Sequence, residues 1–318
     1  MTKLRVLTGA EQLTAEYLSD ALGQPVLSFT FTTEESNWAR QVLIIATLAD
    51  GTKRALRLKL CLGETFGRSE VDYYARDYVG LENAPLVRCY DAQFDPVAGY
   101  HLLLDDLSDT HADRRGVAPT LKHGLAIAEA LGRMHAHHWE SAPVPEDSAW
   151  ERYFATVRPG VEAIERATGR AFSEKFEAHA KALRERWADP HGMTLLHGDV
   201  NPTNVLTPKG TESPVYILDR QPFDWSLPYG LAAYDLAYAL TPWSPPAFLR
   251  ENEEAILKRW HDALGQPSYS WERARADWTI SVEHCLHVPI EWCALPETIE
   301  KMRWLWEWQL GNIQGAIP

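Results

Sequence analysis

The feature that most constrains the fold is a change in hydrophobic pattern near Asp105, one third of the way along the chain. Before that point, apolar and polar residues alternate as in half-buried strands, over residues 25–35, 41–62 and 86–107. The dipeptide Asp50-Gly51 and the stretch 96–99 interrupt two of these segments and predict hairpin turns. Residues 69–82 have helical spacing. We therefore expect residues 1–104 to form an antiparallel sheet with one inserted helix.

After that point the pattern becomes helical. Residues 120–139 carry apolar side chains at the spacing of an amphipathic helix, and residues 151–188 continue with charged outer faces. From Leu231 to the end the chain is again mainly helical in pattern. These patterns predict an α+β protein with two lobes. The expected parts are a small sheet lobe (1–104), a short connector (105–110) and a large helical lobe (111–318).

Composition narrows the class of protein. The 318 residues, 45% of them hydrophobic, are enough for one large domain or two lobes with a sizeable core. There is no apolar run of the ~20 residues that a membrane span needs, and the N-terminus lacks the apolar stretch of a secretory signal, so we expect a cytoplasmic protein without a membrane partner. The net charge of −13 argues against a nucleic-acid partner, which requires a basic face. The sparse, scattered cysteines argue against a disulfide framework.

The motif with the most chemical content is His197-Gly198-Asp199. Asn204 follows five residues after the aspartate, and Asp219 another fifteen residues later. Protein-kinase catalytic loops have the same aspartate-to-asparagine spacing, followed by a metal-binding aspartate after a short strand. Phosphoryl transfer needs a carboxylate for the acceptor hydroxyl, and oxygen ligands for Mg²⁺ on the nucleotide phosphates. The spacing therefore predicts a phosphoryl-transfer loop, and the alternative is a polar turn between two strands.

Other common motifs are missing from the sequence. It contains no GxxxxGK[ST] and no GxGxxG, so it has neither a P-loop nor a dinucleotide fingerprint. It also contains no HExxH and no CxxC pair. Any nucleotide site must therefore be built without these loops.

Several stretches resemble a known family. LLHGDVNPTNVL (195–206) and ILDRQPFDWSLPYGLAAYDLAYAL (217–240) resemble the signature of the aminoglycoside phosphotransferase and choline kinase superfamily, small-molecule kinases with a protein-kinase-like fold. ALRLKLC and SEVDYYARDY are similar to the family's phosphate-binding strand and the helix that supports it. YHLLLDDLSDTH (100–111) resembles the hinge of the ecdysteroid-kinase-like branch. The matches extend over residues 25–265.

The resemblance implies roles for the residues of the predicted loop. Asp199 would be the catalytic base, or would orient the acceptor hydroxyl, and His197 would brace the loop. Asn204 and Asp219 would bind Mg²⁺, and Asp235 would cap a helix and support the loop. The implied reaction moves the γ-phosphoryl group of ATP or GTP to a hydroxyl of a small organic acceptor, in a cleft between the lobes.

The resemblance also implies a nucleotide site. Lys59 would contact the α- and β-phosphates, steadied by Glu70, while Arg57 on the same strand face is an alternative. The nucleotide base would meet the backbone of Asp106, Leu107 and Ser108. The turn between the first two strands has no glycine, so Ser36 and Asn37 would supply donors to the phosphates.

The identity of the acceptor is left open. Tryptophans and glutamates are frequent after the catalytic segment, at Trp243, Trp260, Trp271, Trp278, Trp292, Glu251, Glu253, Glu254, Glu283 and Glu291. Aromatic walls with nearby carboxylates suit a drug-sized acceptor with a ring system and a free hydroxyl, such as an aminoglycoside, macrolide or nucleoside antibiotic. The alternatives are a metabolic kinase for choline or for a sugar-like or steroid-like alcohol, and a non-catalytic nucleotide-binding module. A monomer and a homodimer are both compatible with the sequence.

Three further groups of histidine, cysteine and tryptophan residues have both a functional and a packing interpretation. His284, Cys285, His287 and Cys293 are residue types that bind zinc, but their spacing matches no familiar template, and we favour packing in a core. His135, His137 and His138 are expected to pack at a helix end. Trp306 points about 200° away from Trp304 and Trp308 on a helix, so those two could be core while Trp306 reaches a pocket or partner.

Overall fold

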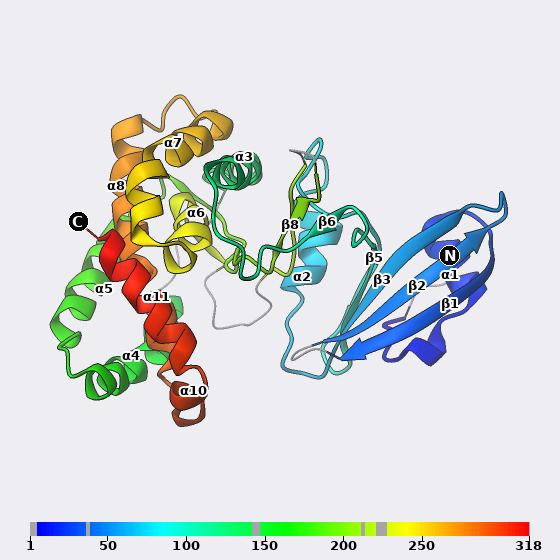
Figure 1. Ribbon diagram of the computed structural model, residues 1–318, viewed down its shortest axis with the longest axis horizontal. Helices are drawn as coiled ribbons and strands as arrows, with labels where there is room; N and C mark the ends of the chain where they lie inside the picture. Colours follow the sequence, from blue (N-terminus) through cyan, green and yellow to red (C-terminus); the bar gives the residue numbers. More distant parts are fainter. Residues whose placement is uncertain (1–4, 36–38, 142–146, 211–213, 221–227, 318) are drawn as a thin grey trace. The chain divides into compact units, whose positions relative to one another are not determined.

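The computed structural model describes residues 5–35, 39–141, 147–210, 214–220 and 228–317 (Figure 1). The chain forms two compact units. Unit 1 comprises residues 1–112, 206–212 and 216–224, and unit 2 comprises residues 113–205, 213–215 and 225–318. The assignment of separate roles to residues 1–104, 105–110 and 111–318 stays a prediction.

Unit 1 is built on a five-stranded antiparallel sheet in the order β1-β2-β3-β5-β4. The strands are β1 (Val26–Glu35), β2 (Arg40–Leu48), β3 (Lys53–Leu62), β4 (Cys89–Asp95) and β5 (Gly99–Asp105). On β2 the alternate residues Val42, Ile44 and Ala46 are fully buried, as the period-2 pattern predicts. Both predicted hairpins are confirmed, and Gly51 takes the left-handed φ of 83° that the β2–β3 turn requires.

A helix that the sequence analysis did not predict, α1 (Ala15–Leu22), packs against this sheet after the short 3-10 turn η1 (Ala10–Gln12). The Thr14 side chain accepts a hydrogen bond from Tyr17 N at 3.0 Å, and Gly23 ends the helix at a φ of 67°. The Tyr17 hydroxyl donates to Asp91 Oδ2 at 2.9 Å, which ties the helix to β4. This helix precedes the first strand, and the sequence pattern did not reveal it because two turns of helix contain too little periodicity.

The predicted helix over residues 69–82 is shorter than expected. It consists of α2 (Ser69–Asp72) and a π-helical turn, η2 (Tyr73–Asp77). The Tyr73 hydroxyl donates to the Ile217 carbonyl at 3.0 Å, and Ile217 lies in β9 (Tyr216–Ile217). β9 belongs to a small sheet of order β6-β8-β9, with β6 (His111–Ala112) and β8 (Val205–Pro208). η2 therefore contacts the strand that leads directly to Asp219.

Unit 2 is mainly helical, which confirms the α+β prediction. Its elements are α3 (Leu121–His137), α4 (Asp147–Thr168), α5 (Ser173–Trp187), β7 (Met193–Leu195), β10 (Tyr229–Leu231), α6 (Ala232–Leu240), η3 (Thr241–Trp243), α7 (Pro246–Leu264), α8 (Trp271–His284), α9 (His287–Trp292), α10 (Pro296–Lys301) and α11 (Arg303–Ala316). Strands β7 and β10 pair antiparallel. Helices α3 and α7 pack closely because Gly132 lacks a side chain: a Cβ there would lie 2.7 Å from the Trp260 carbonyl oxygen. In the part of the chain that is described, no helix is long and apolar enough to span a bilayer.

The tryptophans of α11 are placed opposite to the suggested arrangement. Trp306 is fully buried, whereas Trp304 and Trp308 are 68% and 46% exposed. The buried face of the helix consists of Leu305, Trp306, Gln309, Leu310, Asn312 and Ile313. The suggestion that Trp304 and Trp308 are core was therefore wrong, because the apolar residues one and two turns further along share a face with Trp306. Trp260 and Trp278 are also buried, so they belong to the core rather than to an exposed acceptor wall.

The histidines and cysteines near residue 290 lie in the core of unit 2, at His284, Cys285, His287 and Cys293. The Tyr153 hydroxyl lies 2.6 Å from His284 Nε2 and 2.9 Å from His287 Nδ1. Burial lowers the pKa of both histidines well below the ordinary value, so both rings are neutral. Among the residues that the structure describes, no three His, Cys, Asp or Glu side chains are grouped as a metal site requires. These observations support the core interpretation.

Candidate active site

The carboxylate of Asp199 lies in the loop after β7 and accepts hydrogen bonds from side chains of unit 2. Asn201 Nδ2 and the Tyr238 hydroxyl lie 2.9 and 2.8 Å from its Oδ1. Asn204 Nδ2 lies 3.1 Å from its Oδ2 and 2.9 Å from its carbonyl oxygen. These donors stabilise the ionised carboxylate and hold it in one orientation.

Local bonds shape this loop. Asn201 Oδ1 accepts hydrogen bonds from the backbone N of Thr203 at 2.8 Å and from its hydroxyl at 2.6 Å. Asn204 N donates to the Asn201 carbonyl at 3.0 Å, closing a tight turn around Pro202. Asparagine favours such turns because its side chain bonds the backbone two residues on, and proline presets φ. The asparagines and the proline of the motif therefore place the Asn204 amide on the aspartate.

Asp235 on α6 anchors the start of the same loop. Its carboxylate is fully buried and accepts hydrogen bonds from His197 N at 2.7 Å and Gly198 N at 2.9 Å. Its Oδ2 also lies 3.2 Å from His135 Nε2. Burial alone would raise the pKa of Asp235, but these partners outweigh it, and the pKa lies below the ordinary value. The carboxylate therefore stays ionised and fixes the loop backbone, a different contact from the predicted helix cap.

Two histidines belong to this hydrogen-bonded core. His197 is buried, and its Nδ1 accepts a 3.3 Å bond from Asp199 N, as expected of a residue that braces the loop. His135 Nδ1 accepts a 3.0 Å bond from the indole of Trp260, which leaves its Nε2 proton for Asp235. His135 is thus part of the support of the loop, beyond the simple packing that we expected at this helix end.

Sequence reasoning missed Tyr238 and the position of Glu291. Tyr238 follows Asp235 by three residues on α6, so both side chains fall on the helix face that meets the loop. Burial, followed by the charge of Asp199, raises the pKa of Tyr238 well above the ordinary value, so it remains a donor. Burial and the Asp199 charge also raise the pKa of Glu291, on α9, to about 8. The helical spacing from Asp235 could have indicated Tyr238, but no local signal separated Glu291 from the other glutamates of this region as the one near Asp199.

Unit 1 holds a second cluster, around the amine of Lys59. Lys59 Nζ lies 2.9 and 2.8 Å from the two carboxylate oxygens of Glu70, and 2.9 Å from Asp219 Oδ1. Lys59 is on β3, Glu70 is on α2, and Asp219 follows β9, so three separate elements bring these charges together. Tyr100 also donates a hydrogen bond to Glu70. The structure thus brings together three residues that the sequence assigned to the nucleotide and the metal.

The electrostatics of this cluster favour a charged lysine. Burial lowers the pKa of Lys59, but the charges of Asp219 and Glu70 outweigh it and raise the pKa above the ordinary value. Burial, opposed by Lys59, raises the pKa of Glu70 to about 7. The amine is therefore a fixed positive charge in a site that is mostly shielded from water.

Asp219 has an unusual backbone conformation, and an ion pair of the next residue holds it in place. Its φ is 58°, in the left-handed region that only a few residue types, aspartate among them, adopt readily. The next residue, Arg220, forms a buried 2.5 Å ion pair with Asp77 at the end of η2. Left-handed backbone and an anchoring ion pair hold the Asp219 carboxylate beside Lys59. Arg220 is a positioning residue that sequence reasoning did not identify.

The connector residues are held by unit 1. Asp106 N donates to the Ala55 carbonyl at 3.1 Å, and Ser108 N donates to Asp106 Oδ1 at 3.0 Å. The Leu107 carbonyl accepts bonds from the backbone N of residues 110 and 111. Arg57, the alternative to Lys59, lies 3.5 Å from Asp106 Oδ1 and therefore faces the connector rather than Glu70. Ser36, Asn37 and Asp224 lie outside the described residues.

The predicted Mg²⁺ ligands have suitable chemistry. Asn204 uses its amide nitrogen for Asp199, which turns its Oδ1 away from that carboxylate. Asp219 offers a carboxylate that is 47% exposed. Mg²⁺ prefers oxygen ligands and typically takes one or two from the protein, with phosphate and water completing the shell. Each of the two residues therefore offers the type of oxygen that this cation prefers.

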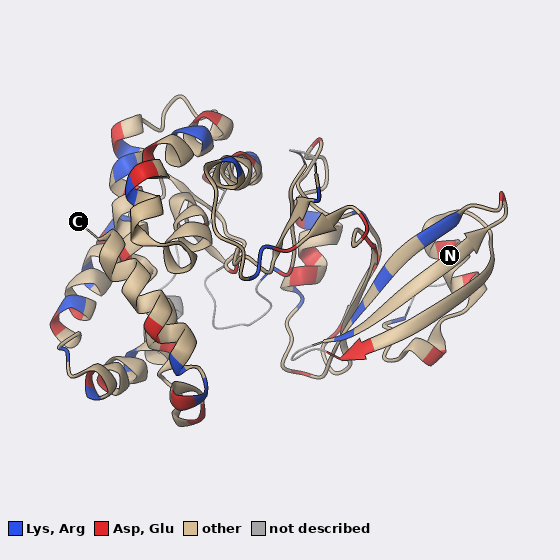
Figure 2. Cartoon of the chain, in the orientation of Figure 1, with Lys and Arg blue, Asp and Glu red and all other residues tan. Residues whose placement is uncertain are grey.

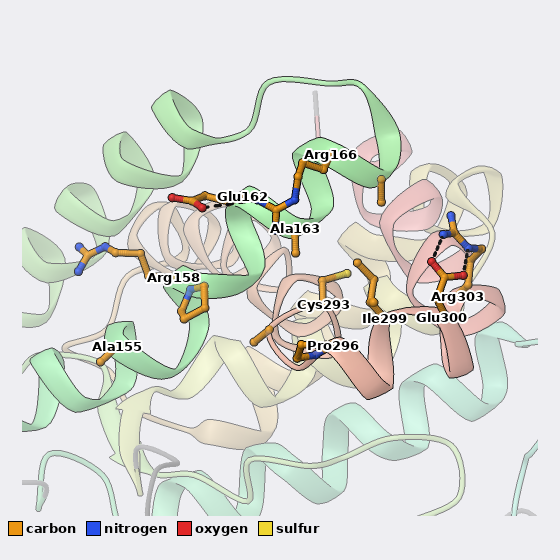
Figure 3. A pocket seen from close by; sticks show the side chains of 13 residues that line it. Ala155, Arg158, Glu162, Ala163, Arg166, Cys293, Pro296, Ile299, Glu300 and Arg303 are labelled. Atoms are coloured by element: carbon orange, nitrogen blue, oxygen red, sulfur yellow. Dashed lines mark hydrogen bonds and ion pairs between the residues drawn. The ribbon is translucent and has the colours of Figure 1, made fainter.

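A hollow of about 980 Å³ opens elsewhere in unit 2, between α4 and the segment from α9 to α11 (Figure 3). Arg166 pairs there with Glu162 at 3.6 Å, and Arg303 pairs with Glu300 at 2.6 Å. Asp199 is not among the lining residues. Because its arginines are already paired with glutamates, we do not assign this hollow to the reaction.

A sequence model of the phosphotransferase enzyme family (APH) matches residues 100–278, which is more than half of the chain. The matched region includes Asp199, Asn204 and Asp219. No curated protein sequence matches the chain.

Two solved structures are similar over nearly the whole chain. One, from Thermobifida fusca, is named as a fructosamine-3-kinase; it is 18% identical, with 96% of this chain and 100% of that chain covered and a TM-score of 0.51. The other is a macrolide 2′-phosphotransferase from Brachybacterium faecium, 17% identical, with 96% and 98% covered and a TM-score of 0.51. At this identity the likeness concerns the fold, and it confirms the predicted kinase-like α+β architecture.

Proposed function

The chain belongs to the phosphotransferase enzyme family, and from this premise we propose that it moves the γ-phosphoryl group of ATP or GTP to a hydroxyl of a drug-sized organic molecule. Membership makes the chain a small-molecule phosphotransferase; the nucleotide and the acceptor are the proposed part. The observation that carries the proposal is the contact of Lys59 with Glu70 and Asp219. Burying an amine between two carboxylates has a desolvation cost, so its presence in the fold indicates a functional role. Binding of the nucleotide polyphosphate is such a role.

On the donor side, Lys59 would bind the α- and β-phosphates while Glu70 holds the amine in place. The connector would bind the nucleotide base through its backbone. Asp106 N, Ser108 N and the Leu107 carbonyl are already engaged within unit 1, so the Asp106 carbonyl and Leu107 N are the groups that we assign to the base. Ser36 and Asn37 remain proposed donors to the phosphates.

On the acceptor side, Asp199 would receive the proton of the attacking hydroxyl. As that proton moves to the carboxylate, the hydroxyl oxygen bonds to the γ-phosphorus, and the bond from this phosphorus to the β–γ bridging oxygen breaks, releasing ADP or GDP. The donors Asn201, Asn204 and Tyr238 hold the carboxylate in position throughout. His197 and Asp235 hold the loop backbone.

Asn204 and Asp219 would hold Mg²⁺. When bound, this cation neutralises charge on the nucleotide phosphates. The Asp219 carboxylate also pairs with Lys59 at 2.9 Å, so the same carboxylate would serve both the amine and the cation.

For the acceptor we propose an antibiotic or similar natural product with a ring system and a free hydroxyl. The partly exposed aromatic side chains of unit 2 support this choice over a small metabolite. A metabolic kinase for choline or for a sugar-like or steroid-like alcohol is the alternative. Cytoplasmic location follows from the same proposal, since ATP and GTP are found there.

The experiment is a phosphorylation assay with Mg·ATP and Mg·GTP and a panel of hydroxylated acceptors, comparing the wild type with Asp199→Asn. We expect phosphorylated acceptor from the wild type, and a loss in the variant on the order of 3 kcal/mol or more in transition-state stabilisation. Equal turnover in the variant would remove Asp199 from its proposed role. Nucleotide binding by both proteins serves as the control for folding.

A further inference from the structure

A row of aromatic side chains leads away from the catalytic carboxylate within unit 2. Tyr238, whose hydroxyl is bonded to Asp199, lies 6.0 Å from Trp243 between ring centroids, with the rings at 90°. Trp243 lies 6.1 Å from Trp308, with the rings at 60°. These side chains come from α6, η3 and α11, so three elements place aromatic rings in a row that begins at Asp199. Tyr238 is buried, and we therefore call the partly exposed Trp243 and Trp308 the aromatic platform.

A hydrogen bond between neighbouring elements holds the platform in place, but one of its indole N–H groups has no partner among the described residues. Asn312 Nδ2 donates to the Pro242 carbonyl at 3.0 Å, which holds α11 against η3 and keeps Trp308 beside Trp243. Trp308 is 46% exposed, and the buried indole Nε1 of Trp243 has no hydrogen-bond partner among the described residues. Exposed aromatic area costs stability, and a ligand with an apolar face would relieve that cost.

Helices α6 and α11 carry few charged residues (Figure 2). Asp235 is the one charged residue of α6 and is used in the loop, while Arg303 and Glu307 of α11 pair at 3.2 Å. Glu291 lies near Asp199, but with a pKa of about 8 it is mostly uncharged at neutral pH. A polycationic acceptor gains affinity from several ionised carboxylates, whereas an uncharged one gains it from apolar contact area.

We propose that the acceptor carries at most one charge and lays an apolar ring face on Trp243 and Trp308 while its hydroxyl reaches Asp199. This inference rests on the proposed function and narrows it to one class of acceptor. Aminoglycosides are disfavoured because their several ammonium groups find too few ionised partners. Choline is too short, since its hydroxyl at Asp199 would leave its ammonium group beside Tyr238, two ring contacts away from Trp308.

The test compares acceptors and tryptophan variants by steady-state kinetics at saturating Mg·ATP or Mg·GTP. The probes are erythromycin and 4-nitrophenyl β-D-glucopyranoside, which have ring faces and at most one charge, together with kanamycin and choline. We expect kcat/KM for a ring-faced probe to exceed that for kanamycin and choline by about 100-fold or more. Trp308→Ala should raise the KM of that probe about tenfold, with a smaller effect on kcat, and Trp308→Phe should recover most of the loss.

Trp304→Ala is the matched control. Trp304 lies one turn before Trp308 on α11, is 68% exposed and has no ring contact with a described residue, so its removal should leave all four rates unchanged. Preferred turnover of kanamycin or choline would overturn the inference, and so would equal KM values in the wild type and Trp308→Ala; in either case the proposed function would stand. Turnover of none of the probes would count against both.

Discussion

The Tyr238 hydroxyl donates a 2.8 Å hydrogen bond to Oδ1 of Asp199, a residue 39 positions earlier in the chain. One turn before Tyr238 on the same helix, Asp235 binds the backbone of His197 and Gly198. Helix α6 therefore controls both the path of the catalytic loop and the orientation of its carboxylate. A change on this helix should affect the rate of phosphoryl transfer even where it touches neither nucleotide nor acceptor.

Replacing Tyr238 with phenylalanine tests this relationship. The variant keeps the ring against Trp243 but loses the donor to Asp199, and a hydrogen bond to a charged group contributes about 1.5–3 kcal/mol. We expect kcat to fall at least tenfold, with little change in the KM of the acceptor. Tyr234→Phe, one turn earlier on α6, is the control and should keep the wild-type kcat. A Tyr238→Phe enzyme with unaltered kcat would show that the bond does not position the base.

Lys59 and Arg57 can be separated by matched substitutions. Lys59 contacts Glu70 and Asp219, whereas Arg57 contacts Asp106, although both residues are on β3. We expect Lys59→Met to lower kcat/KM for the nucleotide by about 100-fold, since a desolvated charge on the phosphates would be lost. Arg57→Met should change it by less than about threefold, as is usual for partly exposed ion pairs. The reverse order in steady-state nucleotide kinetics would transfer the phosphate role to Arg57.

Asp219→Asn should weaken the Mg²⁺ dependence of nucleotide binding. Asparagine tolerates the left-handed φ of 58°, so the backbone should be retained while the ionised ligand is lost. Calorimetric titration of nucleotide with and without Mg²⁺ measures the difference, and we expect the enhancement by Mg²⁺ to fall at least tenfold. Asp50→Asn, in the exposed β2–β3 turn of the same unit, should keep it. Full enhancement in Asp219→Asn would place the ligand elsewhere, for example at Asp224.

Glu291 should make the protein less stable as the pH rises. Its pKa is about 8 in the folded state against an ordinary value of 4.5, so between these values the folded state binds more protons than the unfolded state. The free energy of unfolding therefore falls with rising pH across this window. Glu291→Gln removes this dependence and should gain on the order of 1–3 kcal/mol over the wild type between pH 5 and pH 8.

Urea unfolding at both pH values measures that change. Glu297→Gln, at an exposed site on α10, is the control and should follow the wild type at both. If the free energy of unfolding of Glu291→Gln changed with pH as much as that of the wild type, the pH dependence would not come from the buried Glu291 carboxyl group.

Local features could be predicted from the sequence because they depend on neighbours in the chain. The alternation in β2 and β3 predicted the hairpin, and Asp50-Gly51 predicted its turn. Asp199 and Asn204 are five residues apart, and the turn around Pro202 alone brings the amide to the carboxylate. Short helices such as α1 escaped because two turns contain too little periodicity.

Long-range contacts were decided only by the tertiary structure. Lys59 and Asp219 are separated by 160 residues, and their 2.9 Å contact requires β3, α2 and the segment after β9 to pack together. Periodicity separated Trp306 from Trp304 and Trp308 but could not say which face of α11 is buried. That choice depends on the apolar area contributed by the other helices of unit 2, because burial lowers the free energy of the whole fold rather than of one segment.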